Sequence, residues 1–404
     1  MNKEILSFNN NSDIYEKLIL ILTVFLPISL CLSIFIADLF ASIIGLITLV
    51  LILYKKKLTE CLSLVRKPLG IILFFYFTIL VSLIFSSNFK LSFLPSFFYF
   101  RYLLLSLGIF ILIYKFEQTL KIILFSLIVL LILILIDSSF EMMKIYKVFG
   151  LSLEQYRYNT GATYFITSFF EDEKKLGSFL VRLLPLIISL VIFLDFKILN
   201  KFDVKIPLLL IIGVLIFLTS ERVAFFLFIF TCIFLIKIFK RRLLFLSISF
   251  LTLVILIFAQ PRLFEKYVYV TLSQFEILNS HFMYKKEGKE NERVKILENL
   301  NFSNFKYISD EHEKLLKSGI IIFEENIFTG TGLKNYHRYC KNIKKERSLD
   351  IRCSSHPHNT YIQILSDIGI FGGLLILSIF LYILSLNIKI LFIKNPPRIV
   401  ESFY

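Results

Sequence analysis

Long apolar runs separated by short charged connections limit most strongly what this chain can fold into. A helix that spans the hydrocarbon core of a membrane needs roughly 17–25 mostly apolar residues. Ten runs reach or approach that length, at residues 18–36, 38–54, 69–86, 99–115, 119–137, 177–195, 206–219, 222–238, 243–259 and 368–393. Hydrophobic residues make up 57% of the chain, whereas soluble domains contain about 45–50%. We therefore predict an all-α polytopic membrane protein with about ten transmembrane helices and one large, mainly helical periplasmic loop.

The basic residues predict how the helices are oriented. Short cytoplasmic loops are enriched in Lys and Arg, and the basic stretches fall on one side of the membrane if the N-terminus is cytoplasmic. These stretches are residues 55–67, 115–121, 197–205, 237–242 and 389–398. The loops 138–176 and 260–357 then lie outside. Because topology accounts for the net charge of +15, we expect membrane lipid around the chain and no nucleic acid as a partner.

Three regions follow from this topology. Residues 1–259 would hold transmembrane helices 1–9, residues 260–357 the large periplasmic loop, and residues 358–404 the last transmembrane helix and a cytoplasmic tail. Cys340 and Cys353 both lie in the large loop. In an oxidising compartment they can form a disulfide worth about 3 kcal/mol. Two free thiols are the alternative.

Two histidines lie just before the last apolar run. The sequence His356-Pro357-His358-Asn359 places both imidazoles where water meets lipid. A histidine near its ordinary pKa can accept a proton from a sugar hydroxyl. The structural alternative is a turn in which Pro357 fixes φ and Asn359 caps the helix that follows.

Three arginines are expected at the same membrane level as the histidines. Arg101 begins one apolar run, Arg182 lies about one turn inside another, and Arg222 lies at the junction of two short runs. Arginine inside a span usually faces a partner or a water-filled cavity, and its planar fork binds phosphate oxygens. For each one a structural alternative remains. Arg101 can extend to the lipid headgroups, Arg182 can pair with an acidic residue of 171–173, and Arg222 can form a solvated turn with Glu221.

The chemistry that these residues allow is phosphate binding combined with proton transfer. Arginines can stabilise a diphosphate leaving group in place of a divalent ion. No acidic pair lies beside the histidines to bind such an ion. We therefore expect metal-independent chemistry that needs no cofactor.

The histidine motif resembles the signature of a known family. His358-Asn359 is followed, after nine residues, by Gly369-Ile370-Phe371-Gly372. This pattern is similar to the H-[NSQ]-x9-G-x-x-G motif of the O-antigen ligase and O-antigen polymerase superfamily, bacterial envelope glycosyltransferases. The junction at residues 219–224 resembles the family's arginine-containing junction, with Arg222 in place of its arginine. The resemblance extends over roughly residues 120–390.

The resemblance implies an inner-membrane enzyme with its large loop in the periplasm. Such an enzyme transfers or polymerises glycan from an undecaprenyl-diphosphate donor to an acceptor hydroxyl, in lipopolysaccharide or surface polysaccharide biosynthesis. The acceptor would be a lipid A core or a second lipid-linked glycan. His358 would be the catalytic residue. The substrate-binding residues would be Arg222, Arg182, Arg101, His356 and Asn359.

A transporter or flippase of polysaccharide or lipid-linked solutes is the alternative function. In that case Arg182 and Arg222 would line a path through the bundle and the histidines would carry protons. Such a protein would distribute its charges through the depth of the bundle and contain an internal repeat. The polar residues gather instead at one membrane face, which favours the transferase.

Overall fold

The computed structural model describes most of the chain, and its described residues form two compact units. The described residues are 14–54, 58–116, 118–146, 165–170, 174–194, 205–235, 242–259, 267–268, 271 and 310–391. The first unit comprises residues 1–23, 38–116 and 307–391, and the second comprises residues 24–37, 117–306 and 392–404. Each unit is described by itself below.

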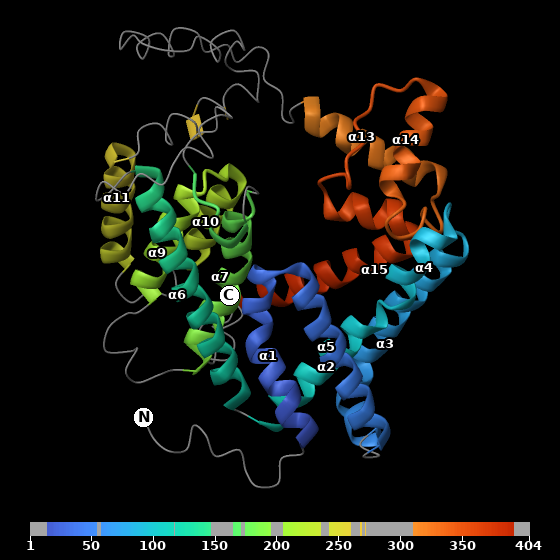
Figure 1. Ribbon diagram of the computed structural model, residues 1–404, viewed down its shortest axis with the longest axis horizontal. Coiled ribbons are helices and arrows are strands. Elements are labelled where there is room, and N and C mark those ends of the chain that lie inside the picture. The colour runs from blue at the N-terminus through green and yellow to red at the C-terminus, as the bar shows by residue number, and fades with distance from the viewer. Residues whose placement is uncertain are drawn as a thin grey trace. The chain divides into compact units, whose positions relative to one another are not determined.

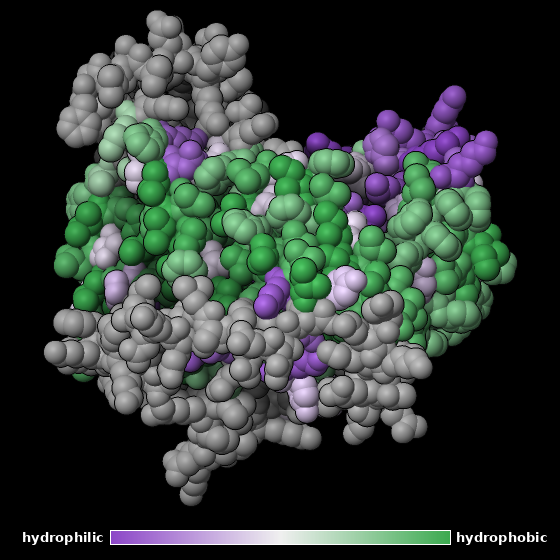
Figure 2. Space-filling model, turned by 60° about the horizontal axis from the view of Figure 1, so that its bottom comes forward, coloured by the Kyte–Doolittle hydropathy of each residue, from purple (hydrophilic) through white to green (hydrophobic). Residues whose placement is uncertain are grey.

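Helices make up nearly all of the described secondary structure, as the apolar runs predict. Among the described residues, six helical stretches are long and apolar enough to cross a membrane: Ile14–Leu32, Ile34–Leu53, Phe89–Lys115, Gln118–Met143, Leu176–Leu194 and Thr360–Ser385. Four shorter apolar helices are Gly70–Ile84, Lys205–Leu218, Arg222–Ile233 and Leu243–Ala259. The predicted runs thus fall on helices wherever their residues are described, with the first run divided at Ser33 between α1 and α2. Many Leu, Ile and Phe side chains remain exposed, and hydrophobic residues cover much of the described surface that Figure 2 shows.

The first unit contains helices from both ends of the chain (Figure 1). Its helices are α3 (Leu58–Ile84), α4 (Phe89–Phe97), α5 (Phe100–Lys115), α13 (Asp310–Glu325), α14 (Tyr336–Arg347) and α15 (Thr360–Leu391), with most of α2 (Ile34–Tyr54) and the first part of α1 (Ile14–Leu32). Helix α15 packs against α13 and α3, and α4 packs against α3. The first unit therefore connects the segment around the histidines to apolar helices near the N-terminus.

A small core outside the apolar helices holds α13 and α14 together. It is built from the buried side chains of Ile322, Tyr336, Cys340, Ile343 and Ile351. The prediction of helical structure in the 260–357 region is confirmed for its last part, residues 310–347. Residues 272–309 of this region lie outside the described residues.

Helix α15 is interrupted at Gly369, and the loop after α13 bonds to the interruption. Gly369 has φ 74° and ψ −169°, a conformation that essentially only glycine adopts. The Ile370 amide donates to the Ile327 carbonyl oxygen at 2.7 Å. In return, the Thr331 and Gly332 amides donate to the carbonyl oxygens that the break leaves free, Ser366 at 2.9 Å and Asp367 at 3.0 Å. The last two donors lie in the Gly-Thr-Gly sequence of residues 330–332.

The second unit is a bundle around α7 (Leu176–Leu194). Helices α6 (Gln118–Tyr146), α9 (Lys205–Leu218) and α10 (Arg222–Leu235) pack against α7, and α11 (Arg242–Ala259) packs against α9. The core residues of these helices are almost all Leu, Ile and Val, among them Leu184, Ile187, Leu209 and Ile216, which are fully or nearly fully buried. Because the core is built from similar aliphatic side chains, the sequence predicts that these helices form but not which of them pack against one another.

Two helix boundaries differ from the prediction. The break between the first two helices falls at Ser33 rather than at residues 37–38, and the Ser33 Oγ accepts from the Phe35 amide. Asp38 therefore lies inside α2 and does not cap it. The last helix begins at Thr360, eight residues before the start predicted from apolar residues alone, because Asn359 caps a polar first turn.

We predict that Gly369→Ala destabilises the first unit strongly. A Cβ at this position would overlap the Phe328 carbonyl oxygen, and the backbone conformation alone costs an alanine about 1–3 kcal/mol. The control is Gly70→Ala in α3, where a Cβ meets nothing within 4 Å. Thermal unfolding of the purified protein in detergent should show a lower midpoint for Gly369→Ala alone. Equal midpoints would contradict the role given to the break.

Candidate functional site

The two histidines of the motif lie in the turn that enters α15. His358 has φ 54°, a left-handed conformation in which histidine is enriched among non-glycine residues. The ring centroids of His356 and His358 lie 4.3 Å apart. His358 is exposed and His356 half-buried, so both imidazoles are accessible at the start of a helix that can cross a membrane.

Asn359 caps α15, as the structural alternative predicted. Its Oδ1 accepts from the amides of Tyr361 at 3.0 Å and Ile362 at 3.1 Å. This bonding satisfies two of the amide groups that a helix start leaves without partners. The side-chain oxygen of Asn359 is therefore engaged in positioning the helix that follows the histidines.

The surroundings of His358 favour its neutral form. Partial burial lowers the pKa of His358, and the nearby His356, His312 and Arg352 lower it further. His312 comes from α13, and its ring centroid lies 6.4 Å from that of His358, nearly edge to face. A neutral imidazole has a ring nitrogen free to accept a proton, which a general base requires.

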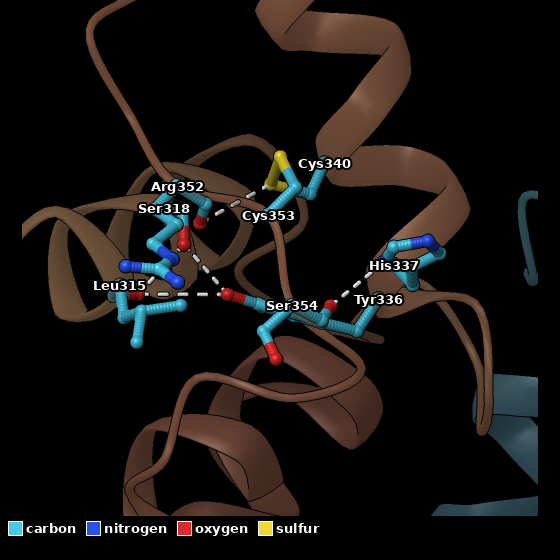
Figure 3. Close-up of a disulfide and its surroundings, with 8 residues drawn as sticks. All are labelled: Leu315, Ser318, Tyr336, His337, Cys340, Arg352, Cys353 and Ser354. Atoms are coloured by element: carbon cyan, nitrogen blue, oxygen red, sulfur yellow. Dashed lines mark hydrogen bonds between the residues drawn. A yellow bond between two sulfur atoms is a disulfide. The ribbon is translucent and has the colours of Figure 1, made fainter. Parts of the chain in front are cut away.

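A disulfide fastens the segment that leads to the histidines. Figure 3 shows Cys340 of α14 bonded to Cys353. Beside it, His337 donates from Nδ1 to the Ser354 carbonyl oxygen at 2.8 Å. The disulfide is the first of the two alternatives that the sequence left open. It ties residues 353–354 to α14 just before His356.

Arg101 is held by a carboxylate. Its Nη2 donates to both carboxylate oxygens of Asp38, at 2.8 and 2.7 Å. The Tyr102 hydroxyl also donates to Asp38. The structure thus gives Arg101 a counterion from α2, where the structural alternative named lipid headgroups.

The junction between α9 and α10 is a tight turn that ends at Arg222. Ser220 has φ 58°, and the Glu221 amide donates to the Thr219 Oγ1 at 3.3 Å. Arg222 is half-buried and its Nη1 lies 3.5 Å from the Thr271 Oγ1. The guanidinium thus lies at the end of two short apolar helices.

The carboxylate of Glu221 accepts hydrogen bonds from the start of α7 and is not simply solvated. Its carboxylate accepts from the Gly177 amide at 2.6 Å, the Ser178 amide at 3.0 Å and the Ser178 Oγ at 2.6 Å. A carboxylate at a helix N-terminus also interacts favourably with the helix dipole. The neighbour of Arg222 therefore has a structural role, and the predicted solvated Glu221–Arg222 turn is wrong for Glu221.

The predicted site residues divide between the two units. Arg101, His356, His358 and Asn359 belong to the first, and Arg182 and Arg222 to the second. Arg182 is exposed on α7, and the acidic residues 171–173 proposed as its partners lie outside the described residues. Within the first unit, the structure brings His356 and His358 together.

Sequence reasoning missed three residues that bear on this site. Asp38 binds Arg101, Glu221 caps α7, and His312 approaches His358. Each of them acts on a residue far away in the sequence or on another helix. The signal for Asp38 was its position as a carboxylate within an apolar stretch, where such a group usually pairs.

The fold and these residues define a helical membrane protein with imidazoles at the start of an interrupted helix. Residues 207–377, from α9 into α15, match the family model described as O-Antigen ligase. This match, over a part of the chain that includes His358 and Gly369, supports the O-antigen ligase superfamily that the histidine motif resembles. None of the curated proteins matches the chain.

We predict that reduction of the disulfide loosens residues 310–353. Removing a native disulfide typically costs about 2–5 kcal/mol, and here it frees the segment before His356 from α14. Hydrogen exchange of α14 should rise in the presence of a reductant. Cys232→Ser, which removes a free cysteine, should respond like the wild type, and the double variant Cys340→Ser, Cys353→Ser should not respond. Equal exchange with and without reductant in the wild type would contradict the prediction.

Proposed function

We propose that this protein is an integral membrane glycosyltransferase of the O-antigen ligase or polymerase type. It transfers glycan from an undecaprenyl-diphosphate donor to a hydroxyl of a lipid A core or of a second lipid-linked glycan. The reaction belongs to lipopolysaccharide or surface polysaccharide biosynthesis. It takes place at the outer face of the bacterial inner membrane, with the large loop in the periplasm.

His358 accepts the proton of the attacking hydroxyl in this mechanism. The hydroxyl oxygen forms a bond to the anomeric carbon of the donor glycan while the bond from that carbon to the phosphate oxygen breaks. The leaving undecaprenyl diphosphate keeps the electron pair of the broken bond. General base catalysis of this kind contributes about 10²–10⁴-fold to a rate.

The donor diphosphate carries charge that cationic side chains can stabilise without a metal ion. Arg222 is proposed to bind it, because guanidinium groups pair with phosphate oxygens bidentately. Arg182, exposed on α7, and His356 are proposed as further substrate-binding residues. The bonds from Arg101 to Asp38 and from Asn359 to α15 give these two residues a structural task in addition to the substrate contacts proposed for them.

A single observation carries the proposal. The match to the O-antigen ligase family includes His358, an exposed imidazole whose pKa is lowered and which precedes a helix long enough to span the membrane. This combination supports a base that acts on a substrate at the membrane surface.

We predict that His358→Ala and Arg222→Ala lose transfer activity by different routes. His358→Ala should lower the turnover rate about 10²–10⁴-fold with little change in donor binding. Arg222→Ala should weaken binding of the donor. The measurement is glycan transfer by the purified protein in vesicles, with the lipid-linked donor varied and a chelator present.

The matched control is Arg338→Ala, which removes an exposed arginine of α14. It should keep the activity of the wild type. An active wild type with equally active His358→Ala and Arg222→Ala variants would show that neither residue has the proposed role.

A further inference from the structure

A third histidine, His312, stands beside the base proposed above. It lies in the first turn of α13, and its ring is 6.4 Å from that of His358 with an interplanar angle of 70°. The rings of His356 and His358 are 4.3 Å apart. His312, His356 and His358 therefore form a histidine cluster, with His358 adjacent to both other rings.

Close packing fixes α13 against the segment that holds the other two histidines. Gly319 lies two turns after His312 on α13, and a Cβ there would overlap Ile362 and press on Pro357. Glycine at this position lets the helix approach the histidine segment directly. The Tyr336 hydroxyl and the Ser318 Oγ, 2.6 Å apart, add a buried hydrogen bond between α13 and α14.

Ion pairs at the exposed end of α13 add to this packing. Arg352 pairs with Glu311, the neighbour of His312. Lys314 pairs with Asp350 at 2.7 Å. The Arg352 amide also donates to the Lys314 carbonyl oxygen at 3.4 Å. His312 is thus held in place by contacts on both sides of it in the sequence.

Two of the cations near His358 belong to ion pairs between its segment and α13. Arg352 is paired with Glu311, and Lys314 is paired with Asp350. The charged and titratable groups that act on His358 are His356, His312 and Arg352. Of these three, His312 is the one that α13 supplies.

We propose that His312 is a positioning residue for His358: its ring, set edge to face against that of His358 in the histidine cluster, keeps a ring nitrogen of His358 free for the acceptor hydroxyl. This inference rests on the function proposed above for His358. His312 itself acts through His358 and need not touch the substrate. Its contribution comes from the edge-to-face arrangement of the two rings, whose centroids lie 6.4 Å apart.

The sign of the effect follows from the charges. A positive neighbour disfavours a second positive charge close to it, and His312 is among the groups that lower the pKa of His358. Loss of the His312 ring should raise the pKa of His358. A permanent positive charge at the same position should lower it. The expected shifts are a few tenths to about one pH unit, as for partly exposed charges a few ångströms apart.

The test is a histidine titration by NMR of the purified full-length protein, labelled with ¹³C at the histidine Cε1. The variants are His312→Gln, which removes the charge, and His312→Lys, which makes it permanent. Lys317→Gln is the matched control, because it removes an exposed positive charge from the same helix. His358→Gln identifies the His358 signal. His358 should titrate at a higher pH in His312→Gln, at a lower pH in His312→Lys, and as in the wild type in Lys317→Gln.

Opposite shifts in the two His312 variants support the proposal, since a purely structural defect would not change direction with the sign of the charge. Unchanged titration of His358, or shifts in one direction in both variants, would overturn it. The acid limb of the transfer rate should follow the same order. If the NMR shifts appear but neither the wild type nor any variant transfers glycan, the proposed function fails while the effect of His312 on His358 is supported. The two failures are therefore distinguishable.

Discussion

The interruption of α15 at Gly369 is the constraint on which the first unit depends. A membrane offers no water to a broken helix, so the freed backbone groups need partners within the protein. The 327–332 segment supplies them, and the Ser82 Oγ of α3 adds a bond at 2.6 Å to the Asp367 carbonyl oxygen. Because that segment directly follows α13, satisfying the break also fixes where α13 and α14 lie on α15 (Figure 1).

The position of the histidine cluster follows from this attachment. Asn359 begins α15, the disulfide ties residue 353 to α14, and Gly319 lets α13 pack on Pro357. These contacts need no ligand, so the cluster is organised before a substrate arrives. Such preorganisation is what makes a proton acceptor effective, since little has to rearrange during the reaction. In the second unit, Glu221 bonds to the start of α7, and its neighbour Arg222 lies with its Nη1 3.5 Å from the Thr271 Oγ1.

The sequence predicts the helices well because lipid selects for length and hydrophobicity, properties that can be read along one chain. It also identifies the motif at His358, because the residues of the motif and the start of the helix that follows lie close together in the sequence. It does not predict the Asp38–Arg101 pair, the break at Gly369 or the approach of His312, because each depends on partners far apart in the sequence. Among the described residues, four apolar helical stretches are shorter than the six that can cross a membrane, and hydropathy alone does not separate the two groups. For the same reason the sequence left open whether Cys340 and Cys353 form a disulfide, because their spacing along the chain does not determine the distance between their sulfur atoms.

The most direct measurement of the central claim is the stoichiometry of the reaction in vesicles that contain the purified protein and a lipid-linked glycan donor. Transfer chemistry predicts one undecaprenyl diphosphate released for each new glycosidic bond on the acceptor. A transporter would instead move the intact donor across the bilayer without releasing the lipid diphosphate. Equal amounts of released lipid diphosphate and lengthened acceptor would support the account. Movement of uncleaved donor, with no new bond, would contradict it.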